Sequence, residues 1–427
     1  MTAEKPREIA VEVLLERAKG QFVEALLDSA LKKHELKSED RGFLQELVYG
    51  AVRWELTLDW LIEQKTDGKP QKEVVQNLLR LALYQMFWLE RVPSYAVVNE
   101  TVEICKGRGL QPQAKFVNAV LRGYDREAAI TRERLEQLKA TKPAIGYSHP
   151  EWLWRRWEKA FGFAGARKLM EWNNSPPPVF ARVNTLRASV EEVRSAWEAE
   201  GVAVEEVKWD WVPKGLVYRF VTNTPIAKLG SFEKGFFYVQ DPSTLLAPAM
   251  LDPQPGSSVL DVCAAPGGKT TYIAQLLKNE GRVVAQDIES ARLRLVEENA
   301  ARLGATCVET GKPLEQGEMF DRVLIDAPCS NTGVMRRRVE LRWRIKPEEI
   351  KRLALTQINI LREAAKRVKA GGVLVYSTCS LEREENQAVV GQFLGENNAF
   401  GLDGERELTP MKKGVDGAYC ARLRRRG

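Results

Sequence analysis

The chain of 427 residues, with 44% hydrophobic and 29% charged residues, has the composition of a globular protein with two or three domains. No apolar run is long enough to span a bilayer, and the N-terminus, MTAEKPREIA, carries charges where a signal peptide has its apolar core, so we expect a cytoplasmic protein. Six dispersed cysteines without a CxxC pair and only two histidines argue against a zinc site or a disulfide framework, and a net charge of +6 hints weakly at a polyanionic partner.

The first part of the chain, from about residue 7 to 124, has the apolar spacing of helices. Apolar residues recur three or four positions apart with polar residues between them, and almost no strand-like alternation interrupts them. Helices are expected to begin at Ser38 and to cover residues 74–89 and 96–106. The pattern therefore predicts an all-helical bundle. Its aromatic residues are expected in the core: Tyr49, Trp54, Trp60, Tyr84, Phe87 and Trp88.

A small α+β domain is predicted after this bundle. Residues 125–144 are charged and poor in apolar clusters, which is typical of a linker. A tryptophan-rich helix is then expected over residues 147–172, and the run NNSPPP ends it. Alternation in VFARVNTL and later short strands complete this domain, in which we expect no catalytic residue.

The stretch from Ser257 to Asp287 predicts one strand-loop-helix-strand unit of a nucleotide-binding sheet. A short apolar run meets AAPGG, the next apolar positions have helical spacing, and Asp287 follows Gly267 at about the 20-residue distance of a ribose-binding carboxylate. The loop matches neither GxGxxG nor a phosphate loop. S-adenosylmethionine fits better because it has a ribose and an adenine but no phosphate, although an ordinary tight connection would look similar.

Strands and helices alternate after this unit, which predicts a mainly parallel sheet with ligands at the carboxyl ends of its strands. A long helix is expected to end at Gly371-Gly372, and the tail over residues 416–423 could add an edge strand. The other expected elements are a helix over residues 292–303 and strands over residues 322–325 and 373–376.

Two of these strands end in reactive turns, Asp326-Ala327-Pro328-Cys329 and Ser377-Thr378-Cys379-Ser380. A lone cysteine after a strand is usually a small buried residue, but two at one edge suggest chemistry. Carbon C5 of a pyrimidine is a poor nucleophile, and a thiolate that adds to C6 activates it. The turns supply two thiols and a carboxylate for such a reaction. The residues alone leave open which thiol attacks.

A basic segment, residues 336–346, lies between the two turns and reads RRRVELRWRIK. Charge runs are usually solvated surface, but this one borders the proposed cleft, so we favour phosphate contacts with packing of Trp343. The target base must leave any stacked helix to reach a thiol, so a single-stranded or looped nucleic acid is the expected substrate form.

Several motifs resemble one family. Three segments of the helical part are similar to the NusB-like domain of bacterial 16S rRNA cytosine-C5 methyltransferases of the RsmB (Sun, Fmu) type. They are SEDRGFLQELVYGAVRWELTLDWLIEQ, LLRLALYQMFWLERVPSYAVVNETVEI and KFVNAVLRGY. Four later segments resemble the other domains of the same family: SHPEWLWRRW, VLDVCAAPGGKT, LIDAPCSNTGV and YSTCSLEREEN. The resemblance implies a Rossmann-like, S-adenosylmethionine-dependent α/β core. The expected domains are residues 1–140 (NusB-like, RNA-binding), 141–235 (small α+β) and 236–427 (catalytic).

The resemblance also assigns roles. It implies Cys379 as the nucleophile, Cys329 in loss of the C5 proton and product release, Asp326 at the base N3/N4 edge and Lys269 beside the base. One departure concerns the adenine side, where CVETGKPLE puts Thr310 or Glu309 at the place of a usual Asp. The implied cofactor-binding residues are Cys263, Ala264, Ala265, Pro266, Gly267, Gly268, Lys269, Asp287, Thr310 and Asp326.

The expected function is methylation of cytosine C5 in 16S rRNA by a monomer that needs no metal and no membrane. Two alternatives remain open. One is a non-catalytic RNA-binding factor for ribosome assembly or antitermination that keeps the fold, and the other is a cytosine-C5 methyltransferase of transfer RNA.

Overall fold

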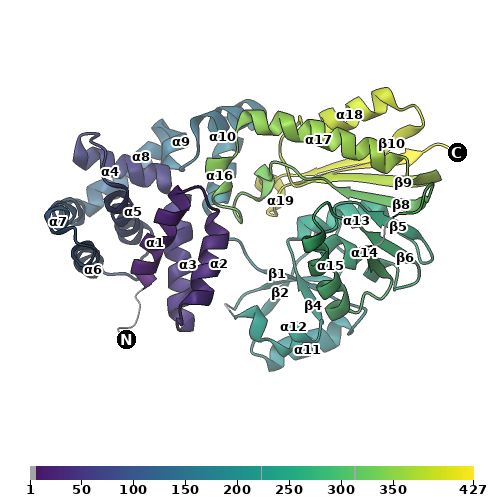
Figure 1. Ribbon diagram of the computed structural model, residues 1–427, viewed down its shortest axis with the longest axis horizontal. Helices are drawn as coiled ribbons and strands as arrows, with labels where there is room; N and C mark the ends of the chain where they lie inside the picture. The colour runs from purple at the N-terminus through teal and green to yellow at the C-terminus, as the bar shows by residue number, and fades with distance from the viewer. Residues whose placement is uncertain (1–5, 223, 312–313) are drawn as a thin grey trace. The chain divides into compact units, whose positions relative to one another are not determined.

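The computed structural model describes residues 6–222, 224–311 and 314–427. The chain divides into two compact units (Figure 1). The first comprises Met1–Ser175 and Met335–Arg344, and the second comprises Pro176–Val334 and Ile345–Gly427. A short segment from the second half of the chain therefore belongs to the first unit.

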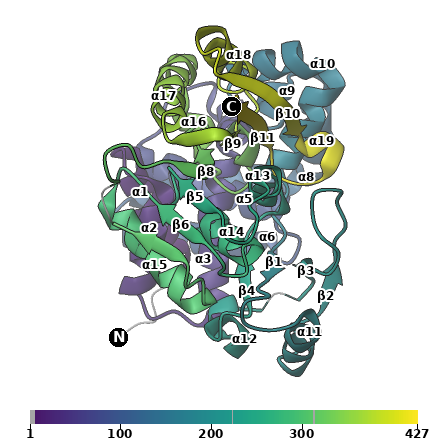
Figure 2. The same ribbon diagram turned by 90° about the vertical axis from the view of Figure 1, so that its right-hand side faces the viewer.

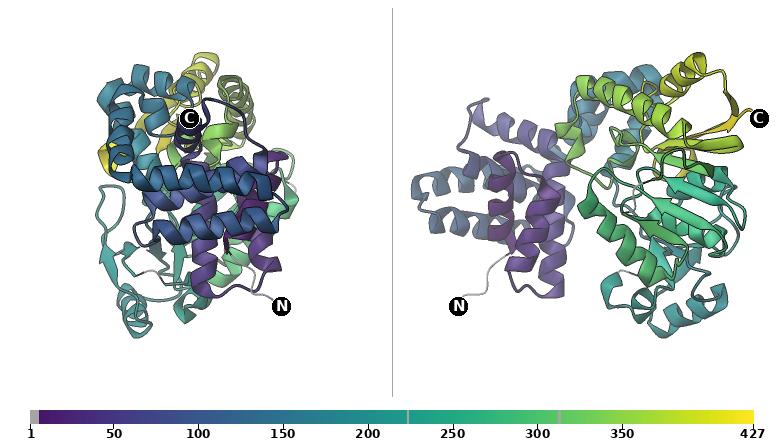
Figure 3. Two further views of the ribbon diagram at one scale, coloured as in Figure 1. Left: turned by 90° about the vertical axis from the view of Figure 1, so that its left-hand side faces the viewer. Right: turned by 45° about the vertical axis from the view of Figure 1, so that its right-hand side comes forward.

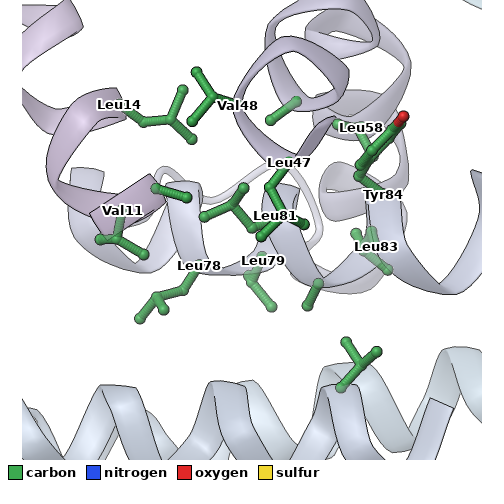
Figure 4. Close-up of a cluster of buried hydrophobic side chains, with 14 of the residues drawn as sticks. Val11, Leu14, Leu47, Val48, Leu58, Leu78, Leu79, Leu81, Leu83 and Tyr84 are labelled. Carbon is green, nitrogen blue, oxygen red and sulfur yellow. The ribbon is translucent and has the colours of Figure 1, made fainter. Parts of the chain in front are cut away.

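The first unit is helical throughout its described residues. The predicted helices at Ser38, 74–89 and 96–106 are present as α3, α5 and α6, and their inward faces share one hydrophobic core, part of which Figure 4 shows. The aromatic residues predicted for the core are buried in it or packed against it. The helices are α1 (Pro6–Ala18), α2 (Val23–Lys33), α3 (Ser38–Arg53), α4 (Glu55–Thr66), α5 (Glu73–Trp88), α6 (Ser94–Gly107), α7 (Gln111–Arg126), α8 (Ala128–Thr141), α9 (Pro143–Gly146), α10 (Glu151–Asn174) and α16 (Leu341–Arg344).

The prediction of a linker over residues 125–144 is wrong, because α8 and α9 occupy this range. Helix α8 is charged on most of its surface, but it buries Thr131, Leu135 and Leu138. These residues are three or four positions apart, so they lie on one face. Three buried positions are enough to dock a helix on a neighbouring core, although they form no conspicuous apolar cluster in the sequence.

The basic segment between the cysteine turns is built into the first unit. Arg342 is fully buried, and Trp343 donates from Nε1 to the Val52 carbonyl at 2.8 Å. Arg336 is also buried, with its guanidinium 3.7 Å from the centre of the Trp172 ring. The expected phosphate contacts are therefore wrong for Arg336 and Arg342, whereas the expected packing of Trp343 is present.

A four-stranded antiparallel sheet opens the second unit, with strand order β2-β3-β1-β4. VFARVNTL supplies β1, as predicted, and Trp197 of α11 packs among the aromatic residues of β3 and β4. Figure 2 shows α11 and α12 beside this sheet. The elements are β1 (Phe180–Val183), α11 (Val190–Ala199), β2 (Val204–Glu206), β3 (Val217–Phe220), η1 (Ile226–Lys228), α12 (Gly230–Glu233) and β4 (Phe237–Val239).

A seven-stranded sheet with order β10-β11-β9-β8-β5-β6-β7 forms the α/β core. Strands β5 to β9 are parallel, as predicted, and helices cover both faces (Figure 3). Residues of α17 and α18 share a core with one face, and those of α13 and α14 with the other. The strands are β5 (Ser258–Asp261), β6 (Arg282–Ala285), β7 (Val308–Thr310), β8 (Phe320–Asp326), β9 (Val368–Thr378), β10 (Phe400–Leu408) and β11 (Ala418–Arg425). The helices are η2 (Pro242–Leu245), α13 (Leu246–Leu251), α14 (Gly268–Leu276), α15 (Ser290–Leu303), η3 (Thr332–Val334), α17 (Pro347–Ala365), α18 (Gln387–Glu396) and α19 (Pro410–Lys413).

Two details of this sheet differ from the prediction. The C-terminal strand β11 is not at the edge, because it pairs with β9 on one side and β10 on the other. Helix α17 ends before Gly371-Gly372, and both glycines lie inside β9. Among the described residues, no helix combines the length and the apolar character needed to cross a membrane.

Candidate active site

The two cysteine turns meet where β8 and β9 end. These strands are parallel neighbours with Asp326 opposite Ser377, so both turns leave the sheet at the same edge. The Sγ atoms of Cys329 and Cys379 lie 3.3 Å apart. Cys329 is buried and Cys379 is half-buried. The structure therefore brings both predicted thiols together at the carboxyl edge of the sheet, with one of them partly open to solvent.

The other thiols near this edge are poorly suited to attack a base. Burial raises the pKa of Cys263 and of Cys420 to about 12, so both stay protonated at neutral pH. The pKa of Cys329 is also raised well above its ordinary value by its hydrogen bond to Cys379 and by burial. Cys379 is thus the half-buried thiol of the pair, beside a partner that holds its own proton.

Asn331 is a neighbour of Cys379 that sequence reasoning missed. The Cys379 thiol donates to Asn331 Oδ1 at 3.0 Å, and Asn331 Nδ2 donates to the Cys329 carbonyl at 2.8 Å. The backbone of Asn331 has a φ of 55°, a left-handed conformation that Asn tolerates better than most residues. One amide therefore contacts both cysteine turns. The position of Asn331 directly after the Pro-Cys-Ser turn is the only sequence feature that points to it.

Lys269 and Asp326 form an ion pair at the same edge. Lys269 Nζ donates to Asp326 Oδ2 at 2.5 Å, and Ser377 Oγ donates to Oδ1 at 3.4 Å. Burial acts to lower the pKa of Lys269, but the charge and hydrogen bond of Asp326 outweigh it, and the pKa is raised. The ammonium group therefore remains charged and fixes the orientation of the carboxylate.

The predicted cofactor loop, Cys263 to Gly268, connects β5 to α14. Asp287 lies against it, because the Ala265 amide donates to Asp287 Oδ2 at 3.2 Å. Gly267 has a φ of 100°, and a Cβ there would approach Val296 Cα at 3.2 Å, so a side chain would fill the turn. Ile288, 98% exposed, places an apolar surface next to Asp287. A carboxylate for a ribose and an apolar face for an adenine fit S-adenosylmethionine.

Thr310 ends β7, at the edge where the adenine-side Asp is expected. Its hydroxyl donates to Glu297 Oε1 of α15 at 2.5 Å. Glu309 is instead paired with Arg282 at the start of β6, at 3.2 Å. Of the two residues considered from the sequence, Thr310 therefore occupies the end of the strand, with a carboxylate from a neighbouring helix beside it.

Arg182, on β1 of the antiparallel sheet, is a second residue that sequence reasoning missed. It is fully buried and donates to the Gly268 carbonyl at 2.9 Å and to Thr271 Oγ1 at 3.1 Å. Burial lowers its pKa to about 10, which leaves it charged at neutral pH. Arg182 therefore supports the start of α14 directly behind the cofactor loop. The sequence feature that points to Arg182 is a charged residue inside the predicted strand FARV.

Asp261, at the end of β5, should make the stability of this unit depend on pH. It is fully buried, its Oδ2 accepts from Thr270 Oγ1 at 2.7 Å, and burial raises its pKa to about 7. The folded state holds the proton of the Asp261 carboxyl more tightly than the unfolded state does. The contribution of this proton to the free energy of unfolding is therefore complete below about pH 4 and is lost as the pH rises to about 7.

We therefore expect Asp261→Asn to gain stability relative to wild type between pH 5 and pH 8, by roughly 2 to 4 kcal/mol. Thermal unfolding of both proteins at several pH values measures the difference. Parallel pH dependences for the two proteins would contradict this assignment of the proton.

Comparison with known proteins agrees with the geometry. The sequence matches three family descriptions: "16S rRNA methyltransferase RsmB/F" over residues 248–424, the NusB family over 4–126, and the ferredoxin-like domain of RsmF/B-like methyltransferases over 149–219. The structure is similar to the crystal structure of PH0851, with a TM-score of 0.78 and 26% identity, covering 98% of this chain and 99% of that one.

Curated relatives extend over the whole chain. A probable ribosomal RNA small subunit methyltransferase B of Bacillus subtilis is 38% identical, covering 99% of both chains. The probable Synechocystis enzyme of the same name is 37% identical, covering 91% of this chain and 88% of its own. The methyl donor of these RNA methyltransferases is S-adenosylmethionine. This chain belongs to the RsmB/F family of 16S rRNA methyltransferases.

Proposed function

We propose that this protein methylates carbon C5 of a cytosine in 16S rRNA through a transient bond between Cys379 Sγ and carbon C6 of the base. The observation that carries the proposal is the 3.3 Å approach of the Cys329 and Cys379 sulfurs beside the Lys269–Asp326 ion pair. A pair of thiols with a fixed carboxylate supplies the nucleophile, the second thiol and the polar contact that C5 chemistry needs. Methylation of an exocyclic amine would need no thiol.

Cys379 would open the reaction by losing its thiol proton to solvent, and the resulting thiolate would form an S–C6 bond. The electron pair of the C5–C6 double bond then moves toward C5. Asp326, fixed by Lys269, would contact the base at its N3/N4 edge, and the ammonium group of Lys269 would stabilise the negative charge that develops on the base. Bound S-adenosylmethionine supplies the methyl group to which C5 then bonds. Once C5 carries this methyl group, it must lose its proton before the double bond can form again.

Cys329 would act in this second half of the reaction. Cys329 would take up the proton that leaves C5, and the electron pair of the C5–H bond re-forms the C5–C6 double bond. Its thiol lies within reach of the departing Cys379 sulfur and would pass its own proton to that sulfur as the S–C6 bond breaks. The electron pair of that bond returns to Cys379, and the methylated base leaves. Residues 263–269 and Asp287 would hold the cofactor, with Ile288 against the adenine and Thr310 at the end of β7.

The target cytosine would be presented in single-stranded or looped RNA, because the base must reach the thiols from outside any stacked helix. We assign RNA binding to the NusB-like domain (1–140), support of the cofactor loop to the middle domain (141–235) and the reaction to residues 236–427. The protein would act in the cytoplasm as a monomer, on naked RNA or on an assembling subunit.

RNA that contains 5-fluorocytosine tests the proposal. Fluorine at C5 cannot leave as a proton does, so the S–C6 bond should persist after methyl transfer and yield a protein–RNA complex that survives denaturing electrophoresis. Unsubstituted RNA is the matched control and should give no stable complex. Failure of the wild-type protein to be trapped, with S-adenosylmethionine and substrate present, would contradict the covalent route.

Thr310 motivates a second candidate, a ribosomal or antitermination RNA-binding factor that retains the fold without catalysis. Thr310 offers a hydroxyl where the family usually offers a carboxylate. Calorimetry that detects no binding of S-adenosylmethionine to the pure protein would favour this reading. Bisulfite sequencing of RNA from a strain without the gene, beside its parent, would identify the modified cytosine and separate ribosomal from transfer RNA.

A further inference from the structure

A buried carboxylate behind the two thiols connects their turns. Glu385 has no exposed surface, and both of its oxygens are occupied. Oε1 accepts from the Ser330 amide at 2.8 Å and from Gln357 Nε2 at 3.0 Å. Oε2 accepts from the hydroxyl of Ser380 at 2.5 Å and from that of Ser330. Four donors therefore converge on one side chain.

These donors come from the elements that carry the chemistry. Ser330 directly follows Cys329, and Ser380 directly follows Cys379, so a single carboxyl group holds the residue next to each thiol. The two serine hydroxyls also contact each other at 3.0 Å. Gln357 of α17 donates to the carbonyl of Pro328 at 2.9 Å, which holds the first turn from its other side.

The backbone of Glu385 is fixed as well. The buried Tyr376 hydroxyl donates to the Glu385 carbonyl at 2.6 Å. The adjacent Asn386 accepts from Thr378 Oγ1 at 2.6 Å and donates to the Ser380 carbonyl at 2.9 Å. Burial raises the pKa of the Glu385 carboxyl. No cation is among its hydrogen-bond partners in the described residues, and the hydroxyl and amide donors balance the cost of burying it.

We propose that Glu385 is a positioning residue that sets the spacing of the Cys329 and Cys379 thiols for the reaction. This inference rests on the proposed function, because it matters only if both sulfurs act on one base. Glu385 touches neither thiol; it acts through Ser330 and Ser380. Because a misplacement of about 1 Å in a reacting pair can cost about 10²-fold in rate, small movements of the turns should be visible in kcat.

Two substitutions distinguish positioning from a need for the charge itself. Glu385→Ala removes all four contacts. Glu385→Gln keeps an oxygen for Ser330 and Gln357, and its amide can donate to the serine hydroxyls, which then act as acceptors. For methyl transfer we expect Glu385→Ala to lower kcat by about 10²-fold with KM for RNA within about threefold, and Glu385→Gln to recover most of this loss. Glu384→Gln, an exposed neighbour, is the matched control and should resemble wild type.

The spacing of the thiols can also be measured without catalysis. Hydrogen peroxide oxidises two thiols to one disulfide and is itself reduced to two molecules of water. Glu385→Ala should slow the formation of the Cys329–Cys379 disulfide, while Glu385→Gln should not. Peptide mapping measures the amount of disulfide over time. If Glu385→Ala does not fold, Ser330→Ala and Ser380→Ala each remove one side of the bridge and should give smaller losses of both kinds.

The outcomes separate this inference from the function on which it rests. Wild-type rates of methylation and disulfide formation in Glu385→Ala, or a Gln variant as defective as Ala, would overturn the positioning role. Failure of wild type to be trapped on 5-fluorocytosine RNA would overturn the covalent mechanism, whereas the comparison of disulfide rates would still report on the spacing.

Discussion

Cys379→Ala is expected to abolish both methyl transfer and the trapped complex with 5-fluorocytosine RNA. Without the Sγ atom no S–C6 bond can form, and C5 remains too weak a nucleophile, so the rate should fall by roughly 10³-fold or more. Tritium transfer from labelled S-adenosylmethionine to RNA and denaturing electrophoresis measure the two effects. Cys307→Ala, a half-buried thiol just before β7, is the matched control and should retain both activities.

Cys329→Ala should behave in the opposite way. The S–C6 bond can still form, but its breakage loses the neighbouring thiol 3.3 Å away, so a complex should accumulate even on unsubstituted RNA. Turnover should fall while the amount of trapped protein rises. Trapping that survives Cys379→Ala but vanishes in Cys329→Ala would reverse the assignment of the two thiols.

The contrast between these thiols shows how much of the site is local in sequence. Cys329 and Cys379 each follow a short apolar strand, and the carboxyl ends of parallel strands share an edge, so their meeting follows from two local patterns and one topological rule. Asp287 and the glycine loop follow in the same way. Nothing comparable predicts Glu385, because its partners Ser330, Gln357 and Ser380 come from three elements whose side-chain directions only the folded chain defines.

The two segments whose role was predicted wrongly also depend on side-chain directions that only the folded chain defines. Charge in residues 125–144 suggests a linker and charge in residues 336–346 suggests an RNA contact, but composition does not say which face of a segment is buried. Helix α8 buries Leu135 and Leu138 on one face, while its charged residues lie on the others. Residues 335–344 belong to the first unit, most of which is distant from them in sequence. Apolar periodicity predicts a helix well where the buried face is wide, as in α5. It predicts poorly where only a few buried residues hold the segment against its neighbours.

Arg342 provides the largest expected effect on stability. Its guanidinium is fully buried in the first unit, and the acceptors it contacts in the described parts of the chain are all uncharged oxygens. Nη1 reaches Asn174 Oδ1 at 2.7 Å and the carbonyls of Ser148 at 3.1 Å and Arg53 at 3.2 Å, and Nη2 reaches the Asn173 carbonyl at 3.2 Å. One planar group thus joins the end of α3, the loop before α10 and the end of α10.

Arg342→Ala should therefore lower the free energy of unfolding of the first unit by about 3 to 5 kcal/mol, because it leaves several buried acceptors without donors and opens a cavity. Arg342→Lys should lie between Ala and wild type, since one ammonium cannot reach acceptors on both sides of a planar fork. Arg338→Ala, an exposed arginine of the same segment, should change stability by less than about 0.5 kcal/mol. Thermal and denaturant unfolding of the full chain measure all three.

RNA binding by these variants separates a structural arginine from a phosphate contact. A residue that neutralises a phosphate lowers the salt dependence of binding by about one unit of slope when it is removed. The N–H donors of Arg342 contact protein oxygens. Arg342→Lys, measured under conditions where it is folded, should therefore bind RNA with the same salt dependence as wild type. A slope reduced by one, with unchanged stability, would mean that this guanidinium turns outward to the RNA and that the buried arrangement is not the one the protein uses.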